Sequence, residues 1–383
     1  MKYDFKSLLS RFAWAVCRLL PIQRRKIVVS NYYGRGYGDN PKAIVQELLR
    51  RNADVQIVWL TDGNHAAASL PDGVKACPYH SLRRIYELST AKVWIDNCRK
   101  GARYKKRGQI YLQTWHGFAL KRIERDVADK LPADYPVYAQ RDSDQTDLIV
   151  SCSRFMTEVY QRSFWYHGDV KEFGAPRNDL LFHPADRPIR KVRSALGIPD
   201  GCRIALYAPT FRADGSLDAY DLDYARLRQC CEQRFGGRFA VAIRLHPNVA
   251  KSAGHLQYDC ETTFNASPYE DMQELLAAAD VIVTDYSSLM FDFCLTRRPC
   301  FQFAVDIEQY RTDRNFYFSL DKLPFPMATD NDELAAQIAA FNEDRYQERI
   351  DAFIQEVGLC TDGLASSRSA DWILETMKGR VNK

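Results

Sequence analysis

The chain has 383 residues, and 46% of them are hydrophobic, which is enough apolar material for the cores of two or three domains. Its 53 basic and 49 acidic residues leave a net charge of +4; this near balance gives no general argument for nucleic-acid binding, and no nucleic-acid partner is expected. The eleven cysteines include no C-x-x-C pair, so the sequence offers no zinc-ligand spacing and indicates reduced thiols in a cytoplasmic protein.

Residues 1–26 differ in character from the rest of the chain. No apolar run is long enough to span a bilayer, and Arg11 and Arg18 break up the apolar core that a signal peptide requires. We expect a basic amphipathic helix lying peripherally on an anionic membrane surface; the alternative is a helix whose apolar face packs on its own protein. The apolar residues that recur at helical spacing are Phe5, Leu8, Leu9, Phe12, Val16, Leu19 and Leu20.

Strand and helix patterns alternate after Pro21, which predicts parallel sheets with crossover helices. A glycine-rich turn at 34–38 leads into a helix for which Asp39 or Asn40 is the expected cap. We assign residues 27–187 to a first Rossmann-like domain. Its expected strands lie at 26–31, 55–61, 92–97, 110–115, 147–152 and 170–176.

A second alternating series begins near residue 188, after the polar, proline-bearing stretch 183–191. It predicts strands at 203–212, 239–248, 280–288 and 299–305, a helix at 267–279 opened by a capping box, and a helical tail from about residue 330. We therefore expect an α/β protein with two Rossmann-like domains facing a cleft, the second comprising residues 188–383.

The stretch "IYLQTWHG" (110–117) places His116 and Gly117 at the C-terminal end of a buried strand. Ligands bind at that edge of open α/β sheets, which favours a catalytic role for His116 over that of a simple loop cap. A basic, helix-like segment follows, and its Lys121 and Arg122 either guide a polyanionic acceptor or belong to a solvated helix face.

Three loops in the second half also follow predicted strands. They offer Thr210 with Arg212, Arg244 with His246, and Asp285, which precedes the helix opened by Ser287 and Ser288. Hydroxyl groups and unpaired amides at a helix start suit a phosphate, although Ser288 could serve only as a helix cap. The convergence of these groups at one sheet edge predicts a diphosphate-binding site.

Five ordered motifs carry a resemblance to a known family: "QTWHG" (113–117), "GAPRNDLLF" (174–182), "LYAPTFR" (206–212), "RLHPN" (244–248) and "VTDYSSLMFDFCLTRRP" (283–299). They resemble the CDP-glycerol glycerophosphotransferases, the primases and polymerases of teichoic acids and related capsule polymers. The resemblance implies a GT-B fold, with peripheral attachment to the cytoplasmic face of the cell membrane. It also implies transfer of an alditol phosphate from CDP-glycerol or CDP-ribitol to a hydroxyl of a lipid-linked or polymer acceptor, with release of CMP.

The resemblance also implies roles for individual residues. His116 matches the proposed general base and His246 a second essential histidine at the donor phosphates. Independently of the resemblance, we assign Gly117, Lys121 and Arg122 to the acceptor, because they adjoin His116 and two of them are basic. Positions linked to donor binding are Thr210, Arg244, Asp285, Ser287 and Ser288. The R-N-D motif, Arg177, Asn178 and Asp179, is expected to be positional or donor-linked. Arg212 is assigned to the donor on its charge, which would stabilise the leaving CMP.

No cofactor is expected, because the sequence shows no carboxylate cluster that demands a metal, although Mg²⁺ would be compatible with the CDP-alditol diphosphate. Phe118 departs from the family pattern, and we expect this bulky residue to alter the acceptor pocket. Two alternatives remain open: a GT-B glycosyltransferase that uses a nucleotide sugar, and an inactive homologue that scaffolds capsule assembly.

Overall fold

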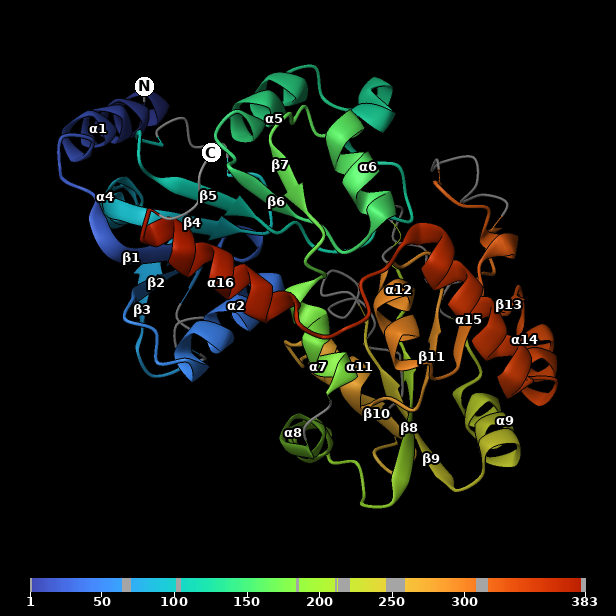
Figure 1. The fold of residues 1–383 in the computed structure, drawn as a ribbon. Coiled ribbons are helices and arrows are strands. Elements are labelled where there is room, and N and C mark those ends of the chain that lie inside the picture. The colour runs from blue at the N-terminus through green and yellow to red at the C-terminus, as the bar shows by residue number, and fades with distance from the viewer. Residues whose placement is uncertain are drawn as a thin grey trace. The chain divides into compact units, whose positions relative to one another are not determined.

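The computed structural model describes residues 2–63, 70–100, 105–183, 186–210, 212, 221–245, 259–307 and 316–379, with the backbone alone for 2–7. The chain forms two compact units. The first comprises Met1–Gly117, Ile123–Asp179 and Leu359–Lys383, and the second comprises Phe118–Arg122 and Leu180–Gly358. Each unit is built on one sheet (Figure 1).

The first unit contains a seven-stranded sheet in the order β3-β2-β1-β4-β5-β6-β7, with every neighbouring pair parallel. This order reverses direction between β1 and β4, as in Rossmann-like folds, and confirms the predicted parallel sheet. The strands are β1 (Gln23–Val29), β2 (Gln56–Thr61), β3 (Val74–Pro78), β4 (Ala91–Asp96), β5 (Ile110–Gln113), β6 (Leu148–Val150) and β7 (Asp169–Lys171).

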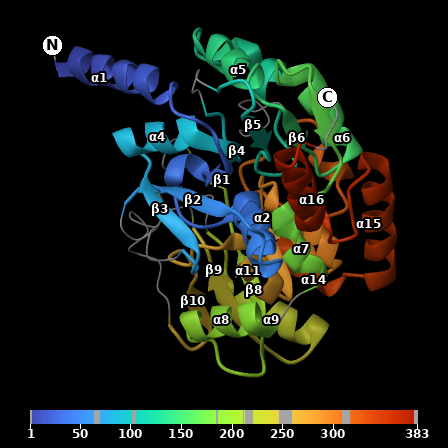
Figure 2. The same ribbon diagram turned by 60° about the vertical axis from the view of Figure 1, so that its left-hand side comes forward.

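Helices cover both faces of this sheet because alternate strand residues point to opposite sides. On one face, α2 (Asp39–Arg50) and α16 (Ala365–Met377) pack on a cluster that includes Ile27 and Val29. On the other face, α1 (Lys2–Cys17) and α4 (Leu82–Thr90) pack on a cluster that includes Val28. The helices α2 and α16 lie side by side in Figure 1, and Figure 2 shows α1 beside α4.

The predicted N-terminal helix is present, and its apolar residues divide between two roles. Trp14 is buried at 5% exposure, with Ala13 and Cys17 packed beside it against the sheet. The side chain of Phe5 lies outside the described part of the helix. The remaining predicted apolar residues are exposed: Leu8 (64%), Leu9 (41%), Phe12 (66%), Val16 (46%), Leu19 (86%) and Leu20 (37%).

The second unit contains a six-stranded parallel sheet in the order β10-β9-β8-β11-β12-β13, whose direction reverses between β8 and β11. It therefore repeats the Rossmann-like plan of the first unit. The strands are β8 (Cys202–Tyr207), β9 (Arg238–Ile243), β10 (Thr263–Asn265), β11 (Val281–Thr284), β12 (Cys300–Phe303) and β13 (Met327–Ala328).

The remaining helices complete the two units. In the first unit they are α5 (Tyr135–Ser143) and α6 (Arg154–Ser163), with the 3₁₀ turns η1 (Tyr32–Gly34), η2 (Glu124–Lys130) and η3 (Pro176–Asn178). A short helix, α7 (Asp179–Phe182), begins at the border between the units. The second unit contains α8 (Asp186–Leu196), α9 (Tyr224–Phe235), α11 (Met272–Ala278), α12 (Leu289–Phe293), η5 (Cys294–Thr296), η6 (Leu320–Lys322), α14 (Asn331–Ala339) and α15 (Glu343–Val357).

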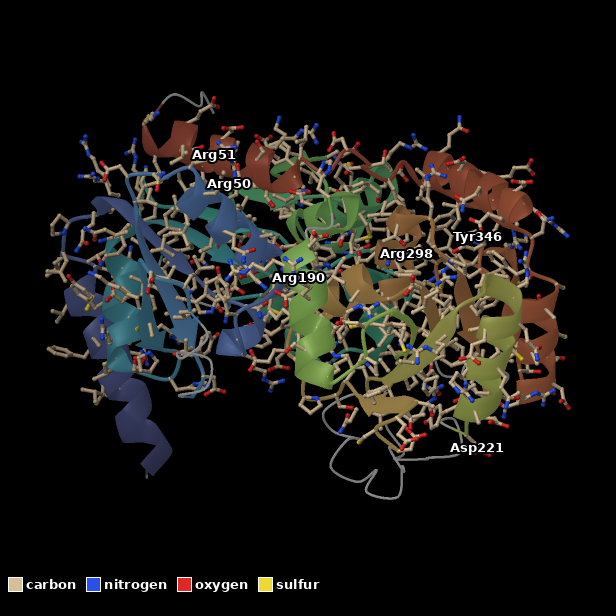
Figure 3. The ribbon with its side chains drawn as sticks, turned by 90° about the horizontal axis from the view of Figure 1, so that it is seen from below. Arg50, Arg51, Arg190, Asp221, Arg298 and Tyr346 are labelled. Carbon is tan, nitrogen blue, oxygen red and sulfur yellow. The ribbon has the colours of Figure 1, made fainter. Side chains whose placement is uncertain are left out.

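The structure corrects the expected domain borders. The tail was expected in the second domain, but residues from Leu359 onward belong to the first unit because Ala370 and Ile373 of α16 enter the core of its sheet. Arg51, which follows α2 and is labelled in Figure 3, also bonds to Ser367 and pairs with Asp371 on α16. The main border lies at Asp179, eight residues before the expected position 187.

Candidate active site

His116 follows β5, and strained backbone on both sides sets its orientation. Trp115 has a φ of 49° and Gly117 a φ of 120°, both in the left-handed region that is costly for residues other than glycine. The ring of Trp115 stacks on that of His116 at 4.2 Å between centroids, while Gln113 accepts a hydrogen bond from the Trp115 N–H at 2.9 Å.

The hydrogen bond of the His116 ring identifies its tautomer. Nδ1 lies 2.8 Å from the carbonyl oxygen of Asn97, which follows β4. Because a carbonyl oxygen only accepts, Nδ1 carries the hydrogen, and Nε2 of the neutral ring is left as a proton acceptor. This arrangement is the one that a general base needs.

The surroundings of His116 keep its ring neutral. Burial is the strongest influence and lowers the pKa; the Asn97 hydrogen bond and the charge of Asp39 raise it, and the charge of Arg177 lowers it. The net pKa of His116 lies below the ordinary value of a histidine, about 6.5. The imidazole is therefore mostly unprotonated at neutral pH.

Arg177 of the R-N-D motif lies directly against this histidine. Its Nη1 donates to the carbonyl oxygen of His116 at 2.8 Å and to Asp39 Oδ2 at 2.7 Å. The guanidinium fills the space beside Gly117, where a Cβ atom would lie 3.2 Å from Cζ and still closer to Nη2. Arg177 and Gly117 thus fit together with His116, and their predicted links to the donor and the acceptor remain predictions.

The start of α2 supplies two residues that were predicted only as caps. The N-cap is Gly38, and no side chain caps this helix end. Asp39 is instead paired with Arg177, and Asn40 Nδ2 donates to the carbonyl oxygen of Trp115 at 3.1 Å. Asn40 Oδ1 also accepts from the Arg177 N–H at 3.1 Å. The capping prediction was therefore wrong; the signal that could have found these contacts is the unusual placement of an acidic residue in a glycine-rich turn.

The other two residues of the R-N-D motif are largely structural in their contacts. Asn178 is buried at 5% exposure in η3. Asp179 accepts hydrogen bonds from the N–H groups of Ala365 and Ser366, at 3.1 and 2.7 Å, and so caps the start of α16. Burial raises the pKa of Asp179 despite these bonds. Their predicted link to the donor remains a prediction.

The basic segment after His116 is not helical. Lys121 forms an isolated antiparallel bridge with Phe316, and Arg122 Nε donates to the Phe316 carbonyl at 3.4 Å. These pairings compete with helix formation, so only the 3₁₀ turn η2 follows, from Glu124. Arg122 is exposed and Lys121 half-buried, and their predicted acceptor role remains a prediction.

Phe118, expected to alter the acceptor pocket, is a core residue of the second unit. It is 3% exposed, and its ring lies 4.5 Å from that of Phe291 and 5.8 Å from that of Phe318, centroid to centroid. Packing within this aromatic cluster accounts for its bulk.

In the second unit, the predicted residues Thr210, Arg212 and Asp285 meet where the strand order reverses. Thr210 N–H donates to Asp285 Oδ1 at 2.8 Å, and Arg212 Nη2 lies 2.8 Å from Asp285 Oδ2. Arg212 also makes a two-pronged contact with Asp306, through Nε at 2.6 Å and Nη2 at 2.9 Å. Asp306 was not predicted, because nothing in the local pattern marks a partner 94 residues away.

Arg244 has a different environment from Arg212. It follows β9, and its guanidinium contacts the carbonyl oxygen of Tyr269 at 3.2 Å and Met272 Sδ at 2.8 Å. Within the described ranges it has no carboxylate within ion-pair distance, and its buried Nε has no hydrogen-bond partner. Burial lowers the pKa of Arg244, with partial compensation from the charge of Asp271. Such a guanidinium suits an anionic ligand.

Ser287 and Ser288 precede α12, as predicted. Ser288 is the N-cap position, yet its side chain makes no capping bond, so capping does not account for its hydroxyl. Ser287 Oγ accepts from the Leu289 N–H at 3.4 Å. His246 lies outside the described residues. The predicted helix at 267–279 begins only at Met272, because Asp271 caps it while Ser267 accepts from the Leu245 N–H.

The described residues form no disulfide bond, metal-binding cluster or membrane-spanning helix. All eleven cysteines are free thiols. No group of three or more histidine, cysteine, aspartate or glutamate side chains suited to a metal occurs among the described residues. None of the helices described combines the length and the apolar character that crossing a bilayer requires.

Comparison with known proteins identifies the family. Residues 12–375 match the CDP-Glycerol:Poly(glycerophosphate) glycerophosphotransferase family. The teichoic acid poly(glycerol phosphate) polymerase of Staphylococcus epidermidis is 29% identical over 93% of this chain and 51% of its own length. The teichoic acid glycerol-phosphate transferase of Staphylococcus aureus is 29% identical over 98% of this chain and 100% of its own length. A teichoic acid ribitol-phosphate primase of Bacillus spizizenii is 27% identical over 93% and 92%, respectively.

The solved structures agree with this assignment. The wall teichoic acid polymerase TagF superposes with a TM-score of 0.84 at 27% identity, covering 99% of this chain and 97% of the solved chain. A histidine variant of TagF has also been solved after a soak with CDPG. The fold is thus the GT-B-like α/β fold of two Rossmann-like domains, as expected. The chain belongs to the CDP-glycerol glycerophosphotransferase family. It spans about half the length of the first two curated polymerases that it matches.

Proposed function

We propose that the protein is a CDP-glycerol glycerophosphotransferase. It transfers glycerol phosphate from CDP-glycerol to a hydroxyl group of a lipid-linked primer or a growing teichoic-acid-like polymer, and it releases CMP. The observation that carries this proposal is the state of His116: Nδ1 is fixed on Asn97, the ring is kept neutral, and Nε2 is the acceptor nitrogen. Attack by a hydroxyl on phosphorus requires such a base.

The chemical step follows from these groups. Nε2 of His116 removes the proton from the acceptor hydroxyl while its oxygen forms a bond to the phosphorus that carries glycerol. The bond from this phosphorus to the oxygen of the CMP phosphate breaks, and CMP leaves with that oxygen and its electron pair. The protonated ring is stabilised by the Asn97 carbonyl at Nδ1, 2.8 Å away, and by the charge of Asp39.

The second unit supplies the groups proposed for the donor. Arg244, which lacks a carboxylate partner within the described ranges, is assigned to the diphosphate, with the hydroxyls of Ser287 and Ser288. These residues follow β9 and β11 at the carboxyl edge of a parallel sheet, where α/β proteins bind ligands. We infer that His246 acts on the same diphosphate. Mg²⁺ is not required in this scheme but could accompany the diphosphate.

Related proteins support CDP-glycerol as the donor over CDP-ribitol. Relatives named for glycerol phosphate match at 29–30% identity, and those named for ribitol phosphate at 26–28%. The TagF structure with CDPG has the same fold as this chain. The family match supports a CDP-alditol donor over the nucleotide sugar of a GT-B glycosyltransferase.

We also propose that the protein works on the cytoplasmic face of the membrane. The exposed residues Leu8, Phe12 and Leu19 give α1 and its end an apolar surface, and Arg11 and Arg18 lie among them. A helix with this composition binds at the boundary of anionic lipid headgroups and acyl chains. Its other side is held to the protein by Trp14.

The decisive experiment measures CMP release from CDP-glycerol and, in parallel, from CDP-ribitol, with and without a glycerol-phosphate or lipid-linked primer. Primer-dependent release from CDP-glycerol is the expected result. Release from CDP-ribitol alone would reassign the donor. If a folded protein releases CMP from neither donor with either primer, the proposed function is wrong.

A further inference from the structure

The backbone of Asp39 has a left-handed conformation, which is costly for a residue other than glycine and is stabilised only by its surroundings. Asp39 is the first residue of α2, and its φ of 59° lies in the left-handed region. Its side chain is only 9% exposed. Burial alone would raise the pKa of Asp39, but the charge of Arg177 and the hydrogen bond from the Asn40 N–H outweigh it, so this carboxyl group has a lowered pKa and is ionised.

The Asp39 carboxylate accepts hydrogen bonds from three groups. Oδ2 accepts from Arg177 Nη1 at 2.7 Å and from the Tyr32 hydroxyl at 3.0 Å, while Oδ1 accepts from the Asn40 N–H at 2.6 Å. Each of these three residues lies next to the histidine loop. Arg177 holds the His116 carbonyl, the ring of Tyr32 lies 5.5 Å from that of His116, and Asn40 holds the Trp115 carbonyl.

No direct contact joins Asp39 to the reacting atoms of the proposed mechanism. We propose that Asp39 is a positioning residue for the reaction: through Arg177 it fixes the backbone of His116, so that Nε2 points toward the acceptor hydroxyl. This inference rests on the proposed function of His116 as the base. It adds a residue from a different element, 138 residues from Arg177 in the sequence.

The geometry explains why a fixed carboxylate is needed here. Arg177 is a long side chain with several staggered rotamers, and its Nη1 must donate to Asp39 and to the His116 carbonyl at once. Without Asp39, the guanidinium would lose the ion pair that helps to hold it in the space beside Gly117. We expect its bond to the His116 carbonyl to weaken, and a shift of about 1 Å at a catalytic group can lower the rate about 100-fold.

The charge of Asp39 also affects the pKa of His116, so the pH dependence of the reaction tests the role of Asp39 separately from the rate. The charged and titratable groups that act on the His116 ring are Asp39 and Glu124, which raise its pKa, and Arg177, which lowers it. The Tyr32 phenol, whose own pKa is raised by burial and by Asp39, stays neutral. Replacing Asp39 by a neutral residue leaves the charge of Arg177 without its counterion. The pKa of His116 must then fall.

The cleanest variant is Asp39→Asn, because asparagine tolerates the left-handed φ and keeps an oxygen for Arg177 while losing the charge. Asp39→Ala removes the side chain altogether. Glu47→Gln is the matched control, since Glu47 lies on the same helix and pairs only with Arg50 and Arg51 among the contacts described for it. The measurements are kcat, KM for CDP-glycerol, the pH profile of kcat/KM, and thermal stability with and without CDP-glycerol.

We expect Asp39→Ala to lower kcat about 10- to 100-fold, with KM for CDP-glycerol and its stabilising effect little changed. Asp39→Asn should lose less, and the acidic limb of its pH profile should move to lower pH. Glu47→Gln should keep the wild-type kcat and profile. Two results would overturn the inference: wild-type kcat in Asp39→Ala, or an acidic limb that does not move in Asp39→Asn. If the wild-type protein itself lacks activity, the proposed function has failed instead.

Discussion

The guanidinium of Arg177 occupies the space that a side chain at position 117 would need. A Cβ atom on Gly117 would lie 3.2 Å from Cζ of Arg177 and would overlap its Nη2. Glycine is therefore required at this position for two reasons. Its φ of 120° is costly for other residues, and a side chain here would block the approach of Arg177 to the His116 carbonyl. The "WHG" triplet and the R-N-D motif are thus two halves of one packing arrangement.

Gly117→Ala should displace Arg177 and so reduce turnover about 100-fold or more, because the His116 backbone loses its anchor. It should also lower stability by about 1–3 kcal/mol through backbone strain. The measurements are kcat and thermal unfolding of the same preparation.

Gly197→Ala provides the matched control. Gly197 also has a positive φ, 72°, but no atom lies within 4 Å of the position of its Cβ. This variant should show the strain cost without the loss of turnover. Equal kcat values for the two variants would contradict the proposed fit between Gly117 and Arg177.

Asp179 should matter for stability more than for donor binding. Asp179→Ala leaves the first N–H groups of α16 without their acceptor, and the loss of such a cap destabilises by about 0.5–2 kcal/mol. Hydrogen exchange of the α16 amides measures this effect directly. Asp371→Ala, which removes an exposed ion pair on the same helix, should change exchange much less. A selective loss of CDP-glycerol binding in Asp179→Ala would instead favour a donor role.

The sequence predicted the layered fold because buried parallel strands and amphipathic helices have strong local patterns. All ten strands that it marked, from 26–31 to 299–305, overlap a strand of the structure. The strands it missed, β3, β10 and β13, all lie at sheet edges, and they are short or half-exposed. Such strands bury too few residues for a clear apolar run.

The sequence predicted individual residues of the site but not the contacts between them. His116, Gly117 and Arg177 were all named, yet the pairing of Asp39 with Arg177 and of Asp306 with Arg212 joins residues 138 and 94 positions apart. Only the folded sheet brings such loops together. Local capping rules therefore misjudged Asp39, whose carboxylate pairs with Arg177, a tertiary partner, besides accepting from the Asn40 N–H of its own helix.

Arg212 and Arg244 should respond differently to substitution. Arg212→Met leaves Asp285 and Asp306 without their cation, and an uncompensated buried charge costs about 3–5 kcal/mol. Arg244→Met leaves no carboxylate within the described ranges without its cation, so the free energy of unfolding should change less than in Arg212→Met. Stabilisation by CDP-glycerol should be lost. Thermal unfolding with and without CDP-glycerol distinguishes them. Full stabilisation of Arg244→Met by the nucleotide would remove Arg244 from the donor site.

Membrane binding should depend on the exposed face of α1. The double variant Leu8→Ser, Phe12→Ser should lower partitioning into anionic vesicles at least tenfold, because burying each of these side chains contributes about 1.5–3 kcal/mol. Thermal stability should stay unchanged. Val137→Ser alters a side chain that is 51% exposed on α5 and serves as control. Unchanged partitioning of the double variant would show that α1 does not bind lipid.

The pH dependence tests the state of His116 directly. Since the pKa of His116 lies below that of an ordinary histidine, the base stays unprotonated as the pH falls from neutral, and kcat/KM should decline only below the usual histidine range. His116→Ala should abolish turnover and the acidic limb together. It should retain stabilisation by CDP-glycerol, because the donor groups lie on other elements. An acidic limb at or above the ordinary histidine pKa, about 6.5, would contradict the lowered pKa of His116. Near-normal turnover of His116→Ala would assign the base to another residue.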